Sequence, residues 1–252
     1  MKKLLLLISI CITPFYYSCN TSYEDAPPPF ATFETKSQMI IVGSNMYVID
    51  NQELKTYSLR DATTPELKSA ISVGFDMLSI NAHDEQLFIG TLNATYIYSI
   101  ANIWAPEYVG TQSSISWCTP LAFKDNYIFA TSTSDRMTGN VCGIHSNSLT
   151  VYDMNNSDNY SYDTSIYMED PRGIAQSFNT LYVADYKTGI CIFDLTDQIN
   201  APFLVNIVDR TQSNLECLVN DNKLYVMQET GFSIFDITTP LFPQKLSQTS
   251  FR

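Results

Sequence analysis

Four side chains suited to ligand recognition stand at similar distances before recurring apolar segments of the chain. They are Asp76, Trp117, Arg172 and Glu216, which lie 12, 11, 10 and 9 residues before the apolar markers described below. An indole ring gives a sugar or a peptide side chain a surface to stack on, and a guanidinium group gives a carboxylate a planar fork. Each residue also has a structural interpretation, with Trp117 packing between repeats and Arg172 forming an ion pair with Asp170 or with a neighbouring blade. We expect all four to surround one opening of the fold.

A polar segment at residues 132–148 contributes three further candidates. It reads STSDRMTGNVCGIHSNS and contains Asp135, Arg136 and His145. The apolar markers on either side of it are 54 residues apart, whereas the other neighbouring markers are 40 to 43 apart, so the segment is an insertion of about 13 residues. Long links on rigid scaffolds often carry function. We therefore predict that these three side chains converge with Trp117 and Arg172 on one face and bind a ligand there.

The chain lacks the residue patterns of the common catalytic and metal-binding motifs. No phosphate-binding loop, zinc-protease or nucleophile-elbow pattern is present, and the sequence has only 2 histidines. Three spaced acids, Asp153, Asp158 and Asp163, lack the alternate spacing and the central glycine of a calcium loop. A glycan hydrolase needs two carboxylates roughly 5 to 9.5 Å apart, and Asp76 and Glu216 are the one pair to nominate. We predict no catalytic residue, no metal site and no cofactor.

The charge balance excludes one large class of partner. The chain has 14 lysines and arginines against 26 aspartates and glutamates, for a formal net charge of −12. Binding to nucleic acid requires clustered cations that neutralise phosphates. We therefore predict no nucleic-acid partner, and the composition does not fix the oligomeric state.

The first 35 residues have the organisation of an export signal followed by a tether. Two lysines precede an apolar stretch at residues 4–12, which is too short to span a bilayer as a helix. The sequence YYSC, which ends at Cys19, resembles a bacterial lipobox, in which the cysteine becomes the lipidated first residue. An ordinary signal peptide beside a cysteine is the alternative. We predict a signal peptide at 1–18, then a lipidated Cys19 and a flexible tether at 19–35, as in an exported outer-membrane lipoprotein on the periplasmic side or at the cell surface.

Four cysteines follow the predicted lipidation site, and three disulfide pairings are open to them. They are Cys118, Cys142, Cys191 and Cys217. Cys191 and Cys217 fall in predicted strands, where a reduced cysteine is a normal small apolar side chain. Cys142 lies in the insertion, and a bond from it to Cys118 or Cys191 would hold that segment.

From residue 36 onward the sequence repeats itself, and this is its strongest signal. An apolar triplet recurs five times, at Met46-Tyr47-Val48, Leu87-Phe88-Ile89, Tyr127-Ile128-Phe129, Leu181-Tyr182-Val183 and Leu224-Tyr225-Val226. A second aromatic residue follows each triplet, at Tyr57, Tyr98, Tyr152, Phe193 and Phe235. A proline follows eight or nine residues later in every repeat but the third, at Pro65, Pro106, Pro202 and Pro243. These markers predict five homologous units, at about 36–74, 75–115, 116–170, 171–212 and 213–252.

Each unit divides into four short strands. In the fourth unit we expect strands at 173–177, 181–184, 190–194 and 202–208, separated by turn residues. Four strands in about 42 residues is the format of a propeller blade, whose two apolar faces must be covered by its neighbours. The sequence therefore predicts an all-β fold, a β-propeller of five four-stranded blades in a single domain at 36–252. Residues 30–35 are a candidate to close the propeller by pairing with the last blade.

Two stretches of the chain resemble a known repeat family. LYVAD, GICIFDLTD and APFLV at residues 181–205, together with GFSIFDITTP at 231–240, are similar to the LVIVD-repeat proteins, a propeller-like family of bacterial lipoproteins. The first two repeats match more loosely, and the third departs most. The resemblance implies a fold and no reaction, so it assigns no functional residue.

These observations favour a binding function over catalysis. We expect an envelope-anchored, non-enzymatic binding or scaffold module for a protein or glycan partner, which uses the face that bears the insertion. A glycan-active hydrolase or lyase and a purely architectural envelope component are the alternatives.

Overall fold

The structure is a computed structural model that describes residues 38–50, 52–74, 77–113, 115, 119–134, 146–155 and 160–251. The predicted signal peptide, Cys19, the tether and the candidate closing segment lie outside the described residues. No helix that is long and apolar enough to cross a membrane occurs in the described part of the chain.

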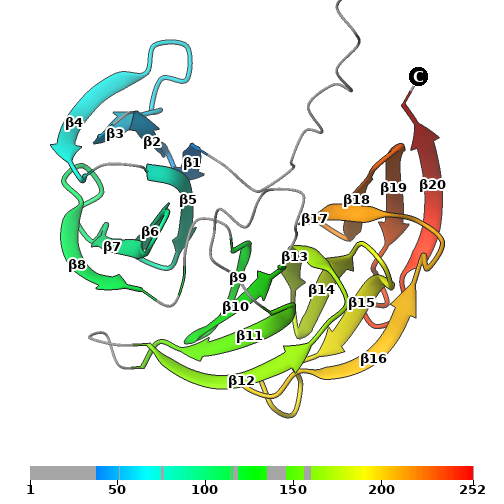
Figure 1. Ribbon diagram of the computed structural model, residues 1–252. Helices are drawn as coiled ribbons and strands as arrows, with labels where there is room; N and C mark the ends of the chain where they lie inside the picture. Colours follow the sequence, from blue (N-terminus) through cyan, green and yellow to red (C-terminus); the bar gives the residue numbers. More distant parts are fainter. Residues whose placement is uncertain are drawn as a thin grey trace, which may run out of the picture. The chain divides into compact units, whose positions relative to one another are not determined.

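Twenty strands form five four-stranded antiparallel sheets, each made of consecutive strands (Figure 1). The first two sheets contain β1 (Met39–Val42), β2 (Asn45–Asp50), β3 (Glu53–Ser58), β4 (Glu66–Ser72), β5 (Met77–His83), β6 (Gln86–Thr91), β7 (Thr95–Ser99) and β8 (Glu107–Gln112). The third and fourth contain β9 (Leu121–Lys124), β10 (Tyr127–Ser132), β11 (Ser148–Asp153), β12 (Ser161–Tyr167), β13 (Pro171–Ser177), β14 (Thr180–Asp185), β15 (Gly189–Asp194) and β16 (Phe203–Val208). The fifth contains β17 (Asn214–Asn220), β18 (Lys223–Gln228), β19 (Gly231–Asp236) and β20 (Gln244–Ser250). The predicted fold class is confirmed: the chain is a β-propeller of five four-stranded blades.

The second aromatic marker has the same structural place in every blade. In each sheet the pairing of the third and fourth strands shifts register at this residue, at Tyr57, Tyr98, Tyr152, Phe193 and Phe235. A β-bulge of this kind increases the local twist of the sheet. The four recurring prolines come directly before the outermost strands, β4, β8, β16 and β20. A residue without an N–H group removes no hydrogen bond between strands at that position.

The turn between the first two strands of each blade requires a left-handed backbone conformation at its first residue. This residue has a φ between 49° and 59° in all five blades, and it is Gly43, Asp84, Asp125, Phe178 and Asp221 in turn. Glycine and aspartate tolerate positive φ, whereas a bulky side chain there is strained. Phe178 is therefore the exception to a rule that the other four blades follow.

The third repeat is offset by one residue from the alignment that the sequence suggested. In four blades the first residue of the triplet pairs with the second aromatic, as in Leu181 with Phe193. In the third blade the residue paired with Tyr152 is Ile128, so Phe129 and not Ile128 is the equivalent of Tyr182. The alignment was wrong because Tyr127 to Ala130 are all apolar or aromatic, and such a run does not reveal which residues face which neighbour.

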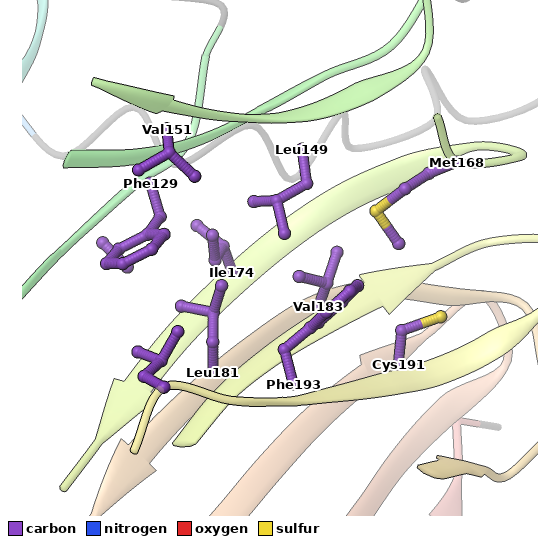
Figure 2. Packing of buried hydrophobic residues seen from close by; sticks show 11 residues of the cluster. Phe129, Leu149, Val151, Met168, Ile174, Leu181, Val183, Cys191 and Phe193 are labelled. Carbon is purple, nitrogen blue, oxygen red and sulfur yellow. The ribbon is translucent and has the colours of Figure 1, made fainter. Parts of the chain in front are cut away.

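Four apolar clusters join the blades in chain order. Each cluster combines one face of a sheet with the facing side of the next, and together they join the first blade to the second, the second to the third, the third to the fourth and the fourth to the fifth. Figure 2 shows the cluster between the third and fourth blades, in which Phe129 and Val151 face Ile174, Leu181 and Val183. Alternate residues of a strand therefore serve different clusters, as the two-residue period of a strand requires.

The burial of the strands follows from this arrangement. Every residue of β14 is buried, because the fourth blade has a neighbour on both faces. In β2 of the first blade and β19 of the fifth, buried residues alternate with half-buried ones. None of the four clusters of described residues covers that second face of the first or the fifth blade.

His83 has a structural role that its sequence context did not suggest. The sequence places it among turn residues, where a solvated side chain is expected, but it is the last residue of β5. Its ring stacks on Phe123 with 4.9 Å between the ring centroids, and its Nε2 lies 2.8 Å from the carbonyl oxygen of Asp125. His83 thus joins the second blade to the third.

Candidate functional site

Two of the seven ligand-binding candidates fall within the described residues. They are Arg172 and Glu216, whereas Asp76, Trp117, Asp135, Arg136 and His145 lie outside them. The residues that flank the insertion, up to Ser134 and from Ser146, are described. The geometry of the site is therefore built from Arg172, Glu216 and the two ends of the insertion.

Arg172 lies in a β-bulge at the start of the fourth blade. The pairing of β13 with β14 shifts between Pro171 and Gly173, which leaves Arg172 as the extra residue. Bulges of this kind redirect a side chain. The guanidinium group donates to both carboxylate oxygens of Asp170, at 3.2 and 3.1 Å, and lies 4.3 Å from the centroid of the Tyr186 ring. The predicted ion pair between Arg172 and Asp170 is confirmed, and a role in ligand binding stays a prediction.

A buried carboxylate that the sequence did not single out organises the same region. Asp185, at the end of β14, is fully buried and accepts hydrogen bonds from four backbone N–H groups. Two of them, those of Lys187 and Thr188, belong to the turn that follows the strand, at 3.0 and 2.9 Å. The other two, those of Glu169 and Asp170, belong to the link between the third and fourth blades, at 3.2 and 2.9 Å. Asp185 thus holds together two backbone segments from neighbouring blades.

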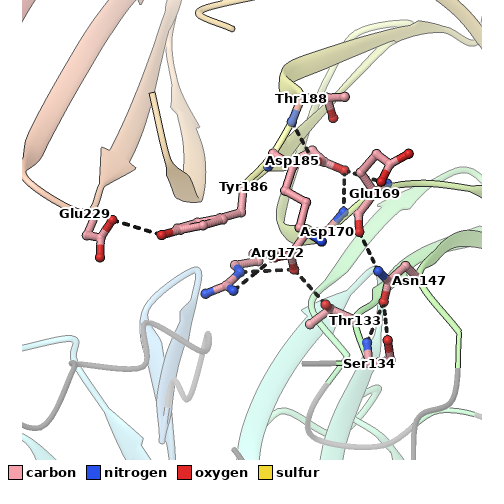
Figure 3. A network of polar contacts seen from close by, with 11 residues as sticks. Thr133, Ser134, Asn147, Glu169, Asp170, Arg172, Asp185, Tyr186, Thr188 and Glu229 are labelled. Carbon is pink, nitrogen blue, oxygen red and sulfur yellow. Dashed lines mark hydrogen bonds and ion pairs between the residues drawn. The ribbon is translucent and has the colours of Figure 1, made fainter. Parts of the chain in front are cut away.

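The two ends of the insertion are bound into this network (Figure 3). Asn147 accepts hydrogen bonds from the N–H and the hydroxyl of Ser134, at 2.6 and 2.8 Å, which brings the two ends together. Its amide donates to the carbonyl of Glu169, and Thr133 donates to Asp170 at 2.7 Å. Thr133 and Asn147, which flank residues 135–145, are therefore held to the link that carries Asp170.

The network also reaches the fifth blade. The hydroxyl of Tyr186, whose ring lies against Arg172, donates to the carboxylate of Glu229 at 2.9 Å. Glu229 lies in the turn between β18 and β19. Links from three successive blades thus meet at one end of their strands, around Arg172 and the insertion.

Glu216 occupies a different position from Arg172. It pairs with Met227, as Gly173 pairs with Ala184, so Glu216 is the equivalent of Gly173 and not of Arg172. The one-residue difference in their spacing from the apolar markers therefore gives Arg172 and Glu216 different positions in the first strands of their blades.

The carboxyl group of Glu216 is held against the fourth blade. A Cβ added to Gly173 would lie 2.6 Å from the Cα and 2.7 Å from Oε1 of Glu216, so the glycine is what allows the two strands to approach. Oε1 accepts a hydrogen bond from the N–H of Cys217 at 3.0 Å. Oε2 is buried and makes no hydrogen bond with the described residues. Burial raises the pKa of Glu216 to about 8, so this carboxyl is neutral at pH 7.

The two described cysteines do not offer nucleophiles or metal ligands. Cys191 and Cys217 are free and buried, as the sequence predicted for residues within strands. Burial raises the pKa of Cys191 to about 11 and that of Cys217 well above its usual value, so both are thiols and not thiolates at pH 7. The alternative bond from Cys142 to Cys191 was wrong, because Cys191 is free. Cys118 and Cys142 lie outside the described residues, and a bond between them stays a prediction.

The arrangement is suited to recognition. Asp170 and Asp185 both accept hydrogen bonds from neighbouring backbone or side-chain donors and so hold the links together. The network provides a fixed set of link ends and an aromatic ring, that of Tyr186, packed against the guanidinium group of Arg172.

Comparison with known proteins supports the fold and no further property. No protein-family model matches the chain, and no curated protein matches it in sequence. Among solved structures, it is similar to a functionally unknown protein from Desulfotomaculum acetoxidans, with 15% identity, a TM-score of 0.64, and coverage of 85% of this chain and 69% of that one.

A protein from Lactobacillus plantarum matches with 13% identity and a TM-score of 0.58, over 84% of this chain and 70% of that one. The computationally designed protein Ika8 matches with 9% identity and a TM-score of 0.57, over 84% and 60%. The chain thus spans between 60% and 70% of the length of these structures. At such low identities the likeness establishes a repeated all-β fold shared with these proteins.

Proposed function

We propose that this protein is an envelope-anchored, non-enzymatic binding module that recognises a protein or glycan partner through the face bearing residues 132–148. The observation that carries this proposal is the network around Asp185, which ties links from three blades to the two ends of the insertion. A fixed base reduces the entropy that a binding segment loses when it engages its partner. Nothing in the fold of the blades requires an insertion there, since the other four blades do without one.

One observation keeps the alternative of a glycan hydrolase open. Glu216 is protonated at neutral pH, as a general acid must be. A hydrolase also requires a second carboxylate roughly 5 to 9.5 Å away, and the nominated partner, Asp76, lies outside the described residues. Glu216 is moreover packed against the backbone of the fourth blade, a place that leaves little room for a substrate.

The anchoring part of the proposal rests on the sequence around Cys19. Lipidation there would attach the chain to the outer membrane, with the tether separating the propeller from the lipid. No other membrane contact is proposed, and the partner is a protein or a glycan of the cell envelope. The resemblance to LVIVD-repeat lipoproteins agrees with this location.

The binding proposal is tested by replacing residues 135–145 with a short Gly-Ser linker in the full chain. Ser134 and Asn147 stay in place, so the network is kept and we expect the thermal midpoint to be unchanged. Capture of envelope proteins and glycans from a detergent extract should fall by roughly tenfold or more, as expected when a main binding segment is removed.

The matched control replaces residues 61–64, an exposed link between β3 and β4, with the same linker. It should capture the partner as well as the unchanged chain does. Equal capture by the chain without 135–145 would contradict the proposal. The same preparations test the anchor, because Cys19→Ser should move the protein from the membrane fraction to the soluble fraction.

A further inference from the structure

A second candidate site lies at the opposite end of the strands from the insertion. It is a pocket of about 450 Å³ formed by turns of the third, fourth and fifth blades. Its lining includes Lys124 from the third blade, Phe178, Asn179 and Asp194 from the fourth, and Pro240 and Leu241 from the fifth. A volume of this size is within the range of small-molecule sites, about 300–1,000 Å³.

Phe178 has a backbone conformation that is unfavourable for phenylalanine. Its φ is 51°, a conformation in which the other four blades have aspartate or glycine at the same turn. Its side chain is also 72% exposed, so the ring does not contribute to the core. Burial of the ring in the core does not offset this backbone strain. A ligand that stacks on the exposed ring gives a reason for a phenylalanine at this position.

The walls of the pocket are held by hydrogen bonds from the neighbouring strands. The hydroxyl of Tyr182 donates to the carbonyl of Pro240 at 2.9 Å, and the amide of Asn206 donates to the carbonyl of Leu241 at 3.3 Å. The carbonyl of Asn179 accepts from the N–H of Leu195 at 2.8 Å. These hydrogen bonds hold the backbone that forms the walls of this open pocket, so the walls need little ordering when a ligand binds.

Charged residues of both signs are among those that line the pocket with Phe178. Asp194 uses Oδ1 to accept from the N–H and the hydroxyl of Thr196, at 2.9 and 2.6 Å. Its Oδ2 makes no hydrogen bond with the described residues, and the ammonium group of Lys124 has one distant carboxylate contact, with Asp125 at 3.5 Å. The pocket thus offers a carboxylate acceptor and an ammonium donor beside an apolar ring and the apolar walls of Pro240 and Leu241.

We propose that this pocket binds a saccharide, with one sugar ring stacked on Phe178 and its hydroxyl groups bonded to Asp194 and Lys124. A pyranose ring presents an apolar C–H face and a rim of hydroxyls that donate and accept, and this combination matches an aromatic surface edged by opposite charges. The charges of Asp194 and Lys124 have opposite signs, so we expect the ligand to be neutral overall. The site is separate from the insertion and does not depend on the function proposed above.

The test uses the full chain on a glycan array, followed by isothermal titration with the best-bound oligosaccharide. Phe178→Asn should weaken binding by roughly tenfold or more, because the stacking surface is lost. Its thermal midpoint should not fall, because asparagine tolerates the positive φ that strains phenylalanine. The chain with residues 135–145 replaced should bind the same oligosaccharide unchanged, which separates this site from the first.

A second pair of variants tests the polar contact. Asp194→Asn keeps the acceptor for Thr196 and removes the charge, and it should weaken binding several-fold. Asp236→Asn is its matched control, since Asp236 accepts the N–H of Thr238 in the equivalent turn of the fifth blade but does not line the pocket. Failure of every glycan to bind, equal binding by Phe178→Asn, or binding of peptides alone would overturn the proposal.

Discussion

Phe129→Ala should cost about 3–5 kcal/mol of the free energy of unfolding, a typical value for removing a buried aromatic ring. Phe129 has no exposed surface, and its ring lies between Val151 of its own blade and Ile174, Leu181 and Val183 of the next. The variant leaves a cavity at the joint between two blades, where both sheets are held by their own hydrogen bonds and cannot close the gap. Urea unfolding followed by circular dichroism measures the change.

The matched control for that experiment is an aromatic residue of the same blade that lies on the surface. Tyr167 is 72% exposed at the end of β12, and Tyr167→Ala should change the free energy of unfolding by roughly 1 kcal/mol or less. A loss for Phe129→Ala as small as that of the control would show that the third and fourth blades do not share this cluster.

Glu216→Gln should stabilise the protein at alkaline pH and not at acidic pH. Burial raises the pKa of Glu216 from 4.5 to about 8. Below about pH 4.5 the carboxyl is neutral in both the folded and the unfolded chain, so it exerts no pH-dependent effect on stability. Between pH 4.5 and 8 the unfolded chain releases this proton while the folded chain keeps it, so the wild-type protein loses stability as pH rises. Glutamine does not titrate and removes that loss.

The size of the effect follows from the shift in pKa. At about 1.4 kcal/mol per pKa unit, the advantage of the glutamine variant over the wild type should grow between pH 4.5 and 8.5 to a ceiling of roughly 4–5 kcal/mol. The amide of the glutamine replaces a buried oxygen, Oε2, that has no partner among the described residues, and this changes the free energy of unfolding by the same amount at every pH. The change moves the plot of free energy against pH up or down and leaves its slope unaltered. Urea unfolding at pH 4, 6 and 8.5 gives the slope directly.

An exposed carboxyl provides the control for the pH series. Glu107→Gln, on the surface of β8, makes the same substitution at a carboxyl that the fold does not bury, and its pH series is measured beside that of Glu216→Gln. If Glu216→Gln runs parallel to the wild type, the carboxyl of Glu216 is ionised in the folded protein and its contact with Gly173 is looser than the structure shows.

The sequence predicted the repeated parts of the fold because their signals are local. The aromatic markers recur at a bulge that every blade needs, and the prolines recur before an outer strand that tolerates them. The register of the third blade was not predictable, because both faces of β10 are apolar and Phe129 and Ile128 fit either neighbour. The spacing of the repeats does not distinguish between these two registers, because the insertion at 132–148 changes the spacing directly after β10.

The polar parts of the site were less accessible to sequence reasoning. Arg172 and its partner Asp170 are two residues apart and were recognised. Asp185 binds backbone N–H groups of the link between the third and fourth blades, about 15 residues earlier in the chain, and no spacing in the sequence reveals this contact. In the sequence Phe178 stands between two expected strands, and its exceptional character appears when its φ is compared with those of the equivalent turns. Aligning the five turns by their first residue would have provided the signal, as aspartate or glycine precedes the second strand in the other four.

Hydrogen exchange of the full chain, followed by mass spectrometry, tests the central claim that stacked apolar faces join the five blades in chain order. The amides of β14 and β15, in the blade that is buried on both faces, should exchange most slowly, and those of β2 and β19 should exchange faster because one face of their blades is half-buried. Exchange that is slowest in β2 or β19, or uniformly fast in β14, would contradict the account.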